Sequence, residues 1–162
     1  MMKFEFKAVG FIRTEHKELS GVPIQPAYAK DKTGKAEILL EYIPGLKDLE
    51  GFSHIIIIYV FDRQQQGDFK LHLVPFLDNR IRGVFATRAP KRPNRIGLSI
   101  VKVEQIKHNM IFFSGADMYD NTPILDIKPF IPDFDSDEKY KIGWLEGKID
   151  LSKKKNSDDR FR

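Results

Sequence analysis

The sequence predicts an all-β protein, a barrel or a sandwich with long loops and at most short helices. Short segments of alternating apolar and polar residues recur along the chain, and its 11 glycines and 9 prolines fall mostly between them. No amphipathic stretch is longer than about two helical turns. With 162 residues the chain fits one domain. We place this domain at residues 1–145 and expect a charged, mobile tail over residues 146–162.

The first predicted strand covers residues 3–13, where apolar and charged residues alternate. Residues 14–32 show little periodicity and contain glycine and proline, so they predict a long loop. Residues 35–43 alternate again and predict a second strand, which Pro44 ends. Residues 46–52 are expected to form one helical turn that covers an end of the barrel.

Residues 54–61 give the strongest strand signal, a continuous run of mostly β-branched residues that predicts burial on both faces. Residues 71–76 predict a short edge strand, because Pro75 cannot donate a ladder hydrogen bond. Residues 84–87 predict a short buried strand, and residues 98–103 predict another by their alternation.

The remaining predicted elements complete the sheet. Residues 110–116 predict a strand that follows a tight turn at residues 107–109. The Asp120–Asn121 pair predicts a turn in which asparagine tolerates a left-handed backbone. Residues 124–130 predict the last strand, and residues 143–145 a final anchored contact.

A basic, proline-containing loop joins two of the predicted strands. Pro90 and Pro93 restrict the backbone and predict a stiff loop, in which Gly97 is expected to adopt an angle that other residues avoid. The loop has two interpretations, a solvated basic segment or a site for an anionic ligand. Its four cations are Arg88, Lys91, Arg92 and Arg95.

Composition and charge exclude several classes of protein. The chain has no cysteine, which excludes disulfides and thiolate metal sites, and its four histidines are scattered, so we expect no metal site. Its longest apolar run, residues 55–61, is too short to span a bilayer, and we see no signal peptide. We therefore expect a cytoplasmic protein. The net charge of +4, with seven cations and no acid in residues 80–102, suits a polyanionic partner.

Residues 86–103, ATRAPKRPNRIGLSIVKV, resemble the signature of the TsaA-like (TrmO) family. Three further segments match in order: GVPIQP at 21–26, LEGFSH at 49–54, and DMYDNTPILDIKPFIP at 117–132. The characterised member of this family is an S-adenosylmethionine-dependent methyltransferase that acts on N6 of threonylcarbamoyladenosine beside the tRNA anticodon. The resemblance therefore implies a small closed or nearly closed β-barrel, S-adenosylmethionine and tRNA as partners, and a homodimer.

The resemblance also implies a donor site built from loops. The sulfonium and amine of the donor need a carboxylate nearby, which Asp117 or Asp120 can supply, and Arg88 suits its carboxylate. Leu98 is equally a core residue or a wall for the adenine. The implied donor-binding residues are Pro23, Ile24, Gln25, Asp62, Arg63, Arg88, Leu98, Asp120, Asn121, Thr122 and Pro123.

Catalytic and RNA-binding roles follow from the same resemblance. Asp120 and Asp62 are the candidates for the group that accepts the proton from the methylated nitrogen. The candidates for phosphate contacts are Lys91, Arg92 and Arg95. Three positions depart from the family pattern: Ile24 replaces an arginine, Asp62 a histidine, and Asn121 a glycine. The alternative function is a β-barrel that binds RNA or a nucleotide without catalysis.

Overall fold

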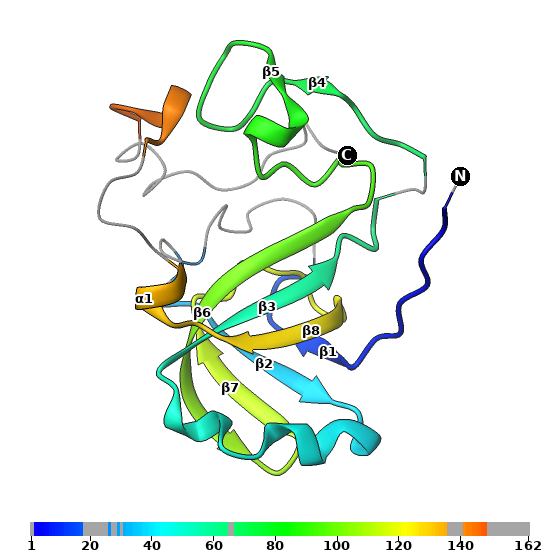
Figure 1. Ribbon diagram of the computed structural model, residues 1–162, viewed down its shortest axis with the longest axis vertical. Helices are drawn as coiled ribbons and strands as arrows, with labels where there is room; N and C mark the ends of the chain where they lie inside the picture. Colours follow the sequence, from blue (N-terminus) through cyan, green and yellow to red (C-terminus); the bar gives the residue numbers. More distant parts are fainter. Residues whose placement is uncertain are drawn as a thin grey trace.

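The computed structural model describes residues 2–17, 26, 29, 31–64, 67–135 and 141–148. Within these ranges, six antiparallel strands close into a barrel in the order β1-β2-β7-β6-β3-β8, which confirms the predicted barrel (Figure 1). Two short strands, β4 and β5, form a separate ribbon. The strands are β1 (Gly10–Arg13), β2 (Thr33–Ile38), β3 (His54–Val60), β4 (His72–Leu73), β5 (Arg82–Gly83), β6 (Ile96–Lys107), β7 (Met110–Ser114) and β8 (Pro123–Pro129).

The helices of the described residues are all short. The four-residue α1 (Pro132–Asp135) follows the last barrel strand. The 3-10 helices are η2 (Leu40–Leu46), η3 (Leu49–Gly51), η4 (Val84–Ala86) and η5 (Gly143–Leu145). No helix in the described part of the chain is long and apolar enough to cross a membrane.

Alternation along the strands fills the barrel with apolar side chains. In β3, Ile55, Ile57 and Tyr59 point into the core, whereas the residues between them are only partly buried. The prediction that this strand is buried on both faces was therefore wrong: the barrel has one interior, and the outer face of β3 is only partly covered. The buried core consists of Ile12, Ala36, Ile38, Ile55, Ile57, Tyr59, Val101, Ile111, Phe113, Ala116, Met118 and Ile124.

The first two strands are shorter than predicted. β1 begins only at Gly10, because this is the first residue that pairs with β2 and β8. The side chains of Phe4 and Phe6 are 70% and 69% exposed, so their alternation does not mark a buried strand. β2 ends at Ile38, and the residues after it form η2 and η3 instead of continuing the strand. Both helices pack apolar side chains against the core, as expected for a cover over one end of the barrel.

The segment predicted as a strand at residues 84–87 is the 3-10 helix η4. Val84 is buried as expected, and it packs with Leu73 and Ala89 in a small second core. Phe85 is 78% exposed. Three residues are too few for periodicity to distinguish one helical turn from a strand.

Three long connections of the barrel meet at one end, those between β1 and β2, between β3 and β6, and between β7 and β8, whereas the β2–β3 connection lies at the other end. β1, β3 and β7 finish at the end where the three connections meet, and β2, β6 and β8 begin there, because neighbouring strands are antiparallel. We call it the loop end. The β4–β5 ribbon lies beyond it, whereas η2 and the β6–β7 turn lie at the opposite end (Figure 1). Any site made from these three connections must therefore form at the loop end.

Candidate functional site at the loop end

The structure brings most of the predicted site residues to the loop end. Asp62 and Arg63 lie just beyond the end of β3, after Phe61. The four cations of the basic loop precede β6, and the turn before β8 supplies the others. Pro23, Ile24 and Gln25 lie outside the described residues. The predicted site residues at this end are Asp62, Arg63, Arg88, Lys91, Arg92, Arg95, Asp120, Asn121, Thr122 and Pro123.

The turn before β8 is held from β1. One carboxylate oxygen of Asp120 accepts a hydrogen bond from the Thr14 amide at 3.1 Å. Asn121 adopts a left-handed backbone with φ 65°, as the sequence predicts. Its side-chain oxygen accepts a hydrogen bond from Arg13 Nη1 at 2.8 Å. Thr122 is buried and Pro123 begins β8.

Arg63 connects three segments of the loop end. Its guanidinium lies over the Tyr119 ring, 4.9 Å from the centroid, and donates to the carbonyl oxygen of Asp120 at 3.2 Å. It also donates to the carbonyl oxygen of Lys17 at 2.5 Å. The neighbouring Asp62 is exposed. Arg63 thus fixes the distance between the end of β3 and the turn before β8.

A buried polar cluster lies at the inner side of the loop end. Ser99 of β6 is fully buried; its Oγ lies 2.7 Å from Asp117 Oδ1 and 3.3 Å from the Tyr59 hydroxyl. A serine hydroxyl has one hydrogen, which serves the shorter contact to the carboxylate. The Tyr59 hydroxyl therefore donates its own hydrogen to Ser99 Oγ. The three side chains form a chain of hydrogen bonds from the core to the Asp117 carboxylate.

Burial shifts the protonation of this cluster. It raises the pKa of Asp117 to about 7, although the hydrogen bond from Ser99, a backbone hydrogen bond and the charge of Arg88 each lower it. Burial also raises the pKa of Tyr59, to which the negative charge of Asp117 contributes. Because the charge of Arg88 acts on both groups, the exposed guanidinium is electrostatically coupled to the cluster. Asp117 is therefore able to gain or lose a proton near neutral pH.

We expect this raised pKa to cost stability at high pH. An unfolded aspartate loses its proton near pH 3.9, whereas Asp117 in the folded chain keeps it up to about pH 7. Between these values the folded state binds more protons, so the free energy of unfolding falls as the pH rises. The D117N variant should therefore gain stability relative to the wild type as the pH rises from about pH 4 to pH 7. Urea unfolding at several pH values measures this; an equal difference at every pH would contradict it.

Two cations of the basic loop make internal contacts. Lys91 is only 6% exposed, and its ammonium lies 2.7 Å from a carboxylate oxygen of Asp68. Arg92 Nη1 donates to the carbonyl oxygens of Val84, Thr87 and Ala89 at 3.3, 2.7 and 3.3 Å. Burial lowers the pKa of Arg92. These contacts explain why the loop is ordered, and the predicted role of both residues in RNA binding stays a prediction.

The end of the basic loop differs from the sequence-based expectation. The left-handed backbone falls on Arg95, with φ 52°, and not on Gly97. Arg95 Nη1 also donates to the carbonyl oxygen of Gln64 at 2.5 Å. Gly97 is needed for space instead, because a Cβ there would lie 2.3 Å from the Tyr59 ring. The absence of a side chain at position 97 therefore leaves room for the Tyr59 ring to pack against β6 beside Ser99.

Leu98 lies apart from the polar cluster. It is 44% exposed and alternates with Gly97 and Ser99, which face the interior, so it points outward from β6. Ile96 is exposed beside it at 41%. Leu98 is therefore not a core residue, and its proposed contact with the adenine stays a prediction.

Ser99 and Tyr59 were not predicted as site residues from the sequence. Both occupy inward-facing strand positions, at which apolar residues are expected. The signal was present: among the alternate positions 97, 99, 101 and 103, only Ser99 has a polar side chain. A buried hydroxyl needs a partner, and Asp117 supplies it.

The described part of the chain contains no group of three or more histidine, cysteine, aspartate and glutamate side chains placed to hold a metal ion. The loop end offers carboxylates, guanidinium groups and backbone groups. Together they offer a carboxyl group that titrates near neutrality beside an exposed cation.

Comparison with known proteins agrees with this geometry. Residues 11–136 match the model of the tRNA-methyltransferase O N-terminal domain. A probable S-adenosyl-L-methionine-binding protein of Pyrococcus abyssi is 46% identical over 157 residues, which are 96% of this chain and 84% of that protein. The tRNA (adenine(37)-N6)-methyltransferase of Escherichia coli is 36% identical over 140 residues, 82% of this chain and 60% of that enzyme.

A solved structure has the same fold. The crystal structure of TrmO from Pseudomonas aeruginosa superposes with a TM-score of 0.73 at 32% sequence identity. The match covers 88% of this chain and 63% of that one. The chain is thus similar to the N-terminal part of these longer proteins.

Proposed function

Because the chain belongs to the tRNA-methyltransferase O family, we propose that it binds S-adenosylmethionine at the loop end and methylates tRNA. The acceptor is N6 of threonylcarbamoyladenosine next to the anticodon. One observation carries the proposal: the barrel gathers Arg63, Arg88, Asp117 and Asp120 at a single end, although they come from three separate connections. The names of the relatives, a donor-binding protein and a tRNA methyltransferase, support the same two ligands.

The residues present fit the charged parts of the donor. The exposed guanidinium of Arg88 suits the donor carboxylate, because a planar fork binds a carboxylate with two parallel hydrogen bonds. The backbone carbonyls of the turn before β8 are suited to the amine and the positive sulfur. Pro23, Ile24 and Gln25 are proposed to complete the site, and Leu98 to lie against the adenine.

The bound donor supplies an electrophilic methyl group, which N6 attacks while the electron pair of the broken bond stays on sulfur. Placing donor and acceptor at near-attack distance provides much of the rate. N6 must lose one proton, and Asp117 is the acceptor that we propose, because its pKa of about 7 suits a general base at neutral pH. Asp120, a candidate from the sequence, holds the Thr14 amide with its carboxylate, and Asp62 is exposed. Both are therefore weaker candidates than Asp117.

The test combines donor binding with product analysis. Calorimetry with S-adenosylmethionine, with and without a chelator, is expected to give equal affinities, because no metal is proposed. Incubation with tRNA and donor, followed by mass spectrometry of the nucleosides, is expected to show one added methyl group on threonylcarbamoyladenosine. A chain that binds tRNA but no donor at millimolar concentration would be the non-catalytic RNA-binding barrel instead.

We expect the basic loop to contribute to tRNA affinity. Replacing Lys91, Arg92 and Arg95 together by glutamine should weaken tRNA binding, because phosphate contacts of Arg92 and Arg95 are lost; Lys91, which is buried against Asp68, is expected to contribute least. The slope of log affinity against log salt concentration should fall by somewhat less than one unit per contact. A filter-binding titration at several salt concentrations measures both.

The control for this prediction is K47Q, which removes one exposed charge at the opposite end of the barrel. It should leave affinity and slope almost unchanged. Because Arg92 also holds the backbone before Arg88, donor affinity must be measured for the triple variant as well. A triple variant that keeps the wild-type slope would place the phosphate contacts elsewhere. A homodimer and a cytoplasmic location remain part of the proposal.

A further inference from the structure

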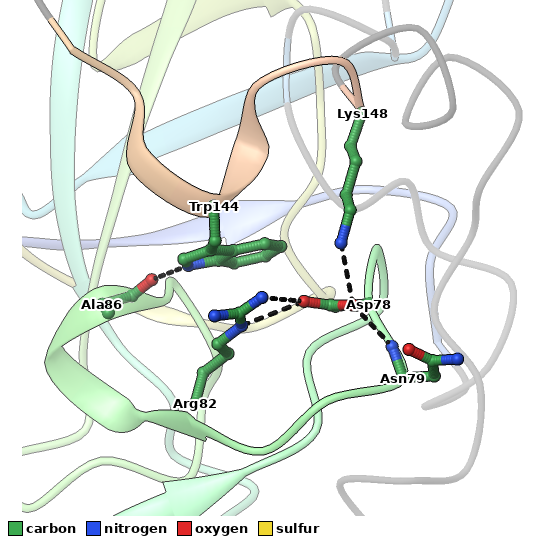
Figure 2. A network of polar contacts seen from close by, with 6 residues as sticks. All are labelled: Asp78, Asn79, Arg82, Ala86, Trp144 and Lys148. Carbon is green, nitrogen blue, oxygen red and sulfur yellow. Dashed lines mark hydrogen bonds and ion pairs between the residues drawn. The ribbon is translucent and has the colours of Figure 1, made fainter.

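The segment of residues 143–148, which we call the C-terminal latch, lies against the loop that contains β5 and η4 (Figure 2). We propose that the latch positions Arg88 for the donor and that Trp144 is its positioning residue. This inference rests on the proposed function, in which Arg88 binds the donor carboxylate. The family match ends at residue 136, so the latch lies outside the matched domain.

Asp78 is the loop residue to which the C-terminal latch is bound by an ion pair. Its side chain is 3% exposed, and one oxygen accepts hydrogen bonds from Arg82 Nε at 2.9 Å and Nη2 at 2.6 Å. The other oxygen accepts from Lys148 Nζ at 2.8 Å and the Asn79 amide at 2.9 Å (Figure 2). These donors hold the pKa of Asp78 far below its usual range, although burial raises it. The carboxylate therefore stays charged and joins the latch to the loop.

Trp144 extends this connection toward Arg88. Its ring is contacted by the guanidinium of Arg82, 5.3 Å from the centroid, and by the ammonium of Lys148 at 5.7 Å. Its indole N–H donates to the carbonyl oxygen of Ala86 at 2.8 Å (Figure 2). Ala86 precedes Arg88 by two residues. The hydrogen bond therefore fixes the backbone just before the proposed donor-binding side chain.

The same backbone is held from a second direction by Arg92. It donates to the carbonyl oxygens on either side of Ala86, those of Val84 and Thr87. With the latch in place, three carbonyls of the segment before Arg88 are held by side chains from elsewhere. The Arg88 side chain itself remains exposed. Ordering this segment in advance lowers the entropy that donor binding must otherwise lose.

The W144F variant isolates the hydrogen bond, because phenylalanine keeps an aromatic ring but has no N–H. We expect donor affinity without tRNA to fall roughly threefold to tenfold. In an R88A background the same substitution should add little, because its effect passes through Arg88. Calorimetry of the four proteins completes this double-mutant cycle. An equal loss in both backgrounds would mean that Trp144 only stabilises the fold, and would overturn the proposal.

Hydrogen exchange provides a readout that needs no donor. In W144F the Thr87 amide, which donates to Val84, should exchange faster, while amides of the β6–β7 pair keep their wild-type rates. An unchanged exchange rate of the Thr87 amide in W144F would overturn the proposal that the latch holds this backbone.

If the wild-type chain bound no donor, the proposed function would fail. The exchange rates would still decide whether the latch holds this backbone. A chain ending after Lys148 should match the wild type in both measurements, and one ending after Ile142 should match or exceed W144F.

Discussion

The D117N variant is expected to lower kcat for tRNA methylation by roughly a hundredfold to ten-thousandfold, the usual contribution of a general base. Asparagine keeps an oxygen that accepts the hydrogen bond from Ser99, but it cannot take a proton. Donor affinity should change much less than kcat. Single-turnover rates with saturating tRNA and donor separate the two effects.

The pH dependence gives a second check on the same residue. The wild-type rate should rise with pH and level off above about pH 7, because the Asp117 carboxyl must be ionised to accept the proton. The residual rate of D117N should lack this rise. D120N and D62N serve as controls, and each is expected to keep the pH profile of the wild type. A normal rate in D117N, with loss in one of the controls, would return the catalytic role to the candidate chosen from the sequence.

The R88A variant should bind S-adenosylmethionine about tenfold to a hundredfold more weakly, even without RNA. A hydrogen bond to a charged group contributes about 1.5–3 kcal/mol, which corresponds to this change in affinity. R88K is the matched variant: it keeps the charge but loses the planar fork, so its affinity should lie between those of R88A and the wild type. Calorimetry at one salt concentration measures all three proteins. Wild-type affinity in R88A would mean that the donor carboxylate binds elsewhere.

The strands could be predicted from the sequence wherever alternation and turn residues agree. The last barrel strand, Pro123–Pro129, which follows the turn at Asp120–Asn121, is a clear case. The prediction failed where hydrogen bonding to neighbouring strands decided which residues form a strand. Residues 3–9 alternate as well as a true strand does, but β1 gains its partners only at Gly10. Alternation describes only which side chains are apolar. It does not show which other strands pair with the segment.

The candidate site was predicted in outline, through the motifs, but not in its internal contacts. Sequence alone placed the four cations in one loop; it did not reveal that Lys91 pairs with Asp68 or that Arg92 binds three carbonyls. Such contacts depend on the direction of each side chain in the folded chain. The cluster of Ser99 with Asp117 was missed for the same reason, because it joins residues of different strands and loops.

The arrangement of the barrel has a consequence for how proteins of this kind diverge. Most core side chains lie on the strands, so exchanging exposed residues in the connections of the loop end leaves the core packing untouched. The exceptions in these connections are Ala116 and Met118, which are buried in the core between β7 and β8. Asp62 and Asn121, two of the departures from the family pattern, are in such connections. We therefore expect exposed residues of these connections to change among relatives at nearly constant thermal stability. Swapping these exposed residues between two relatives should change ligand preference and leave the melting temperature almost unchanged.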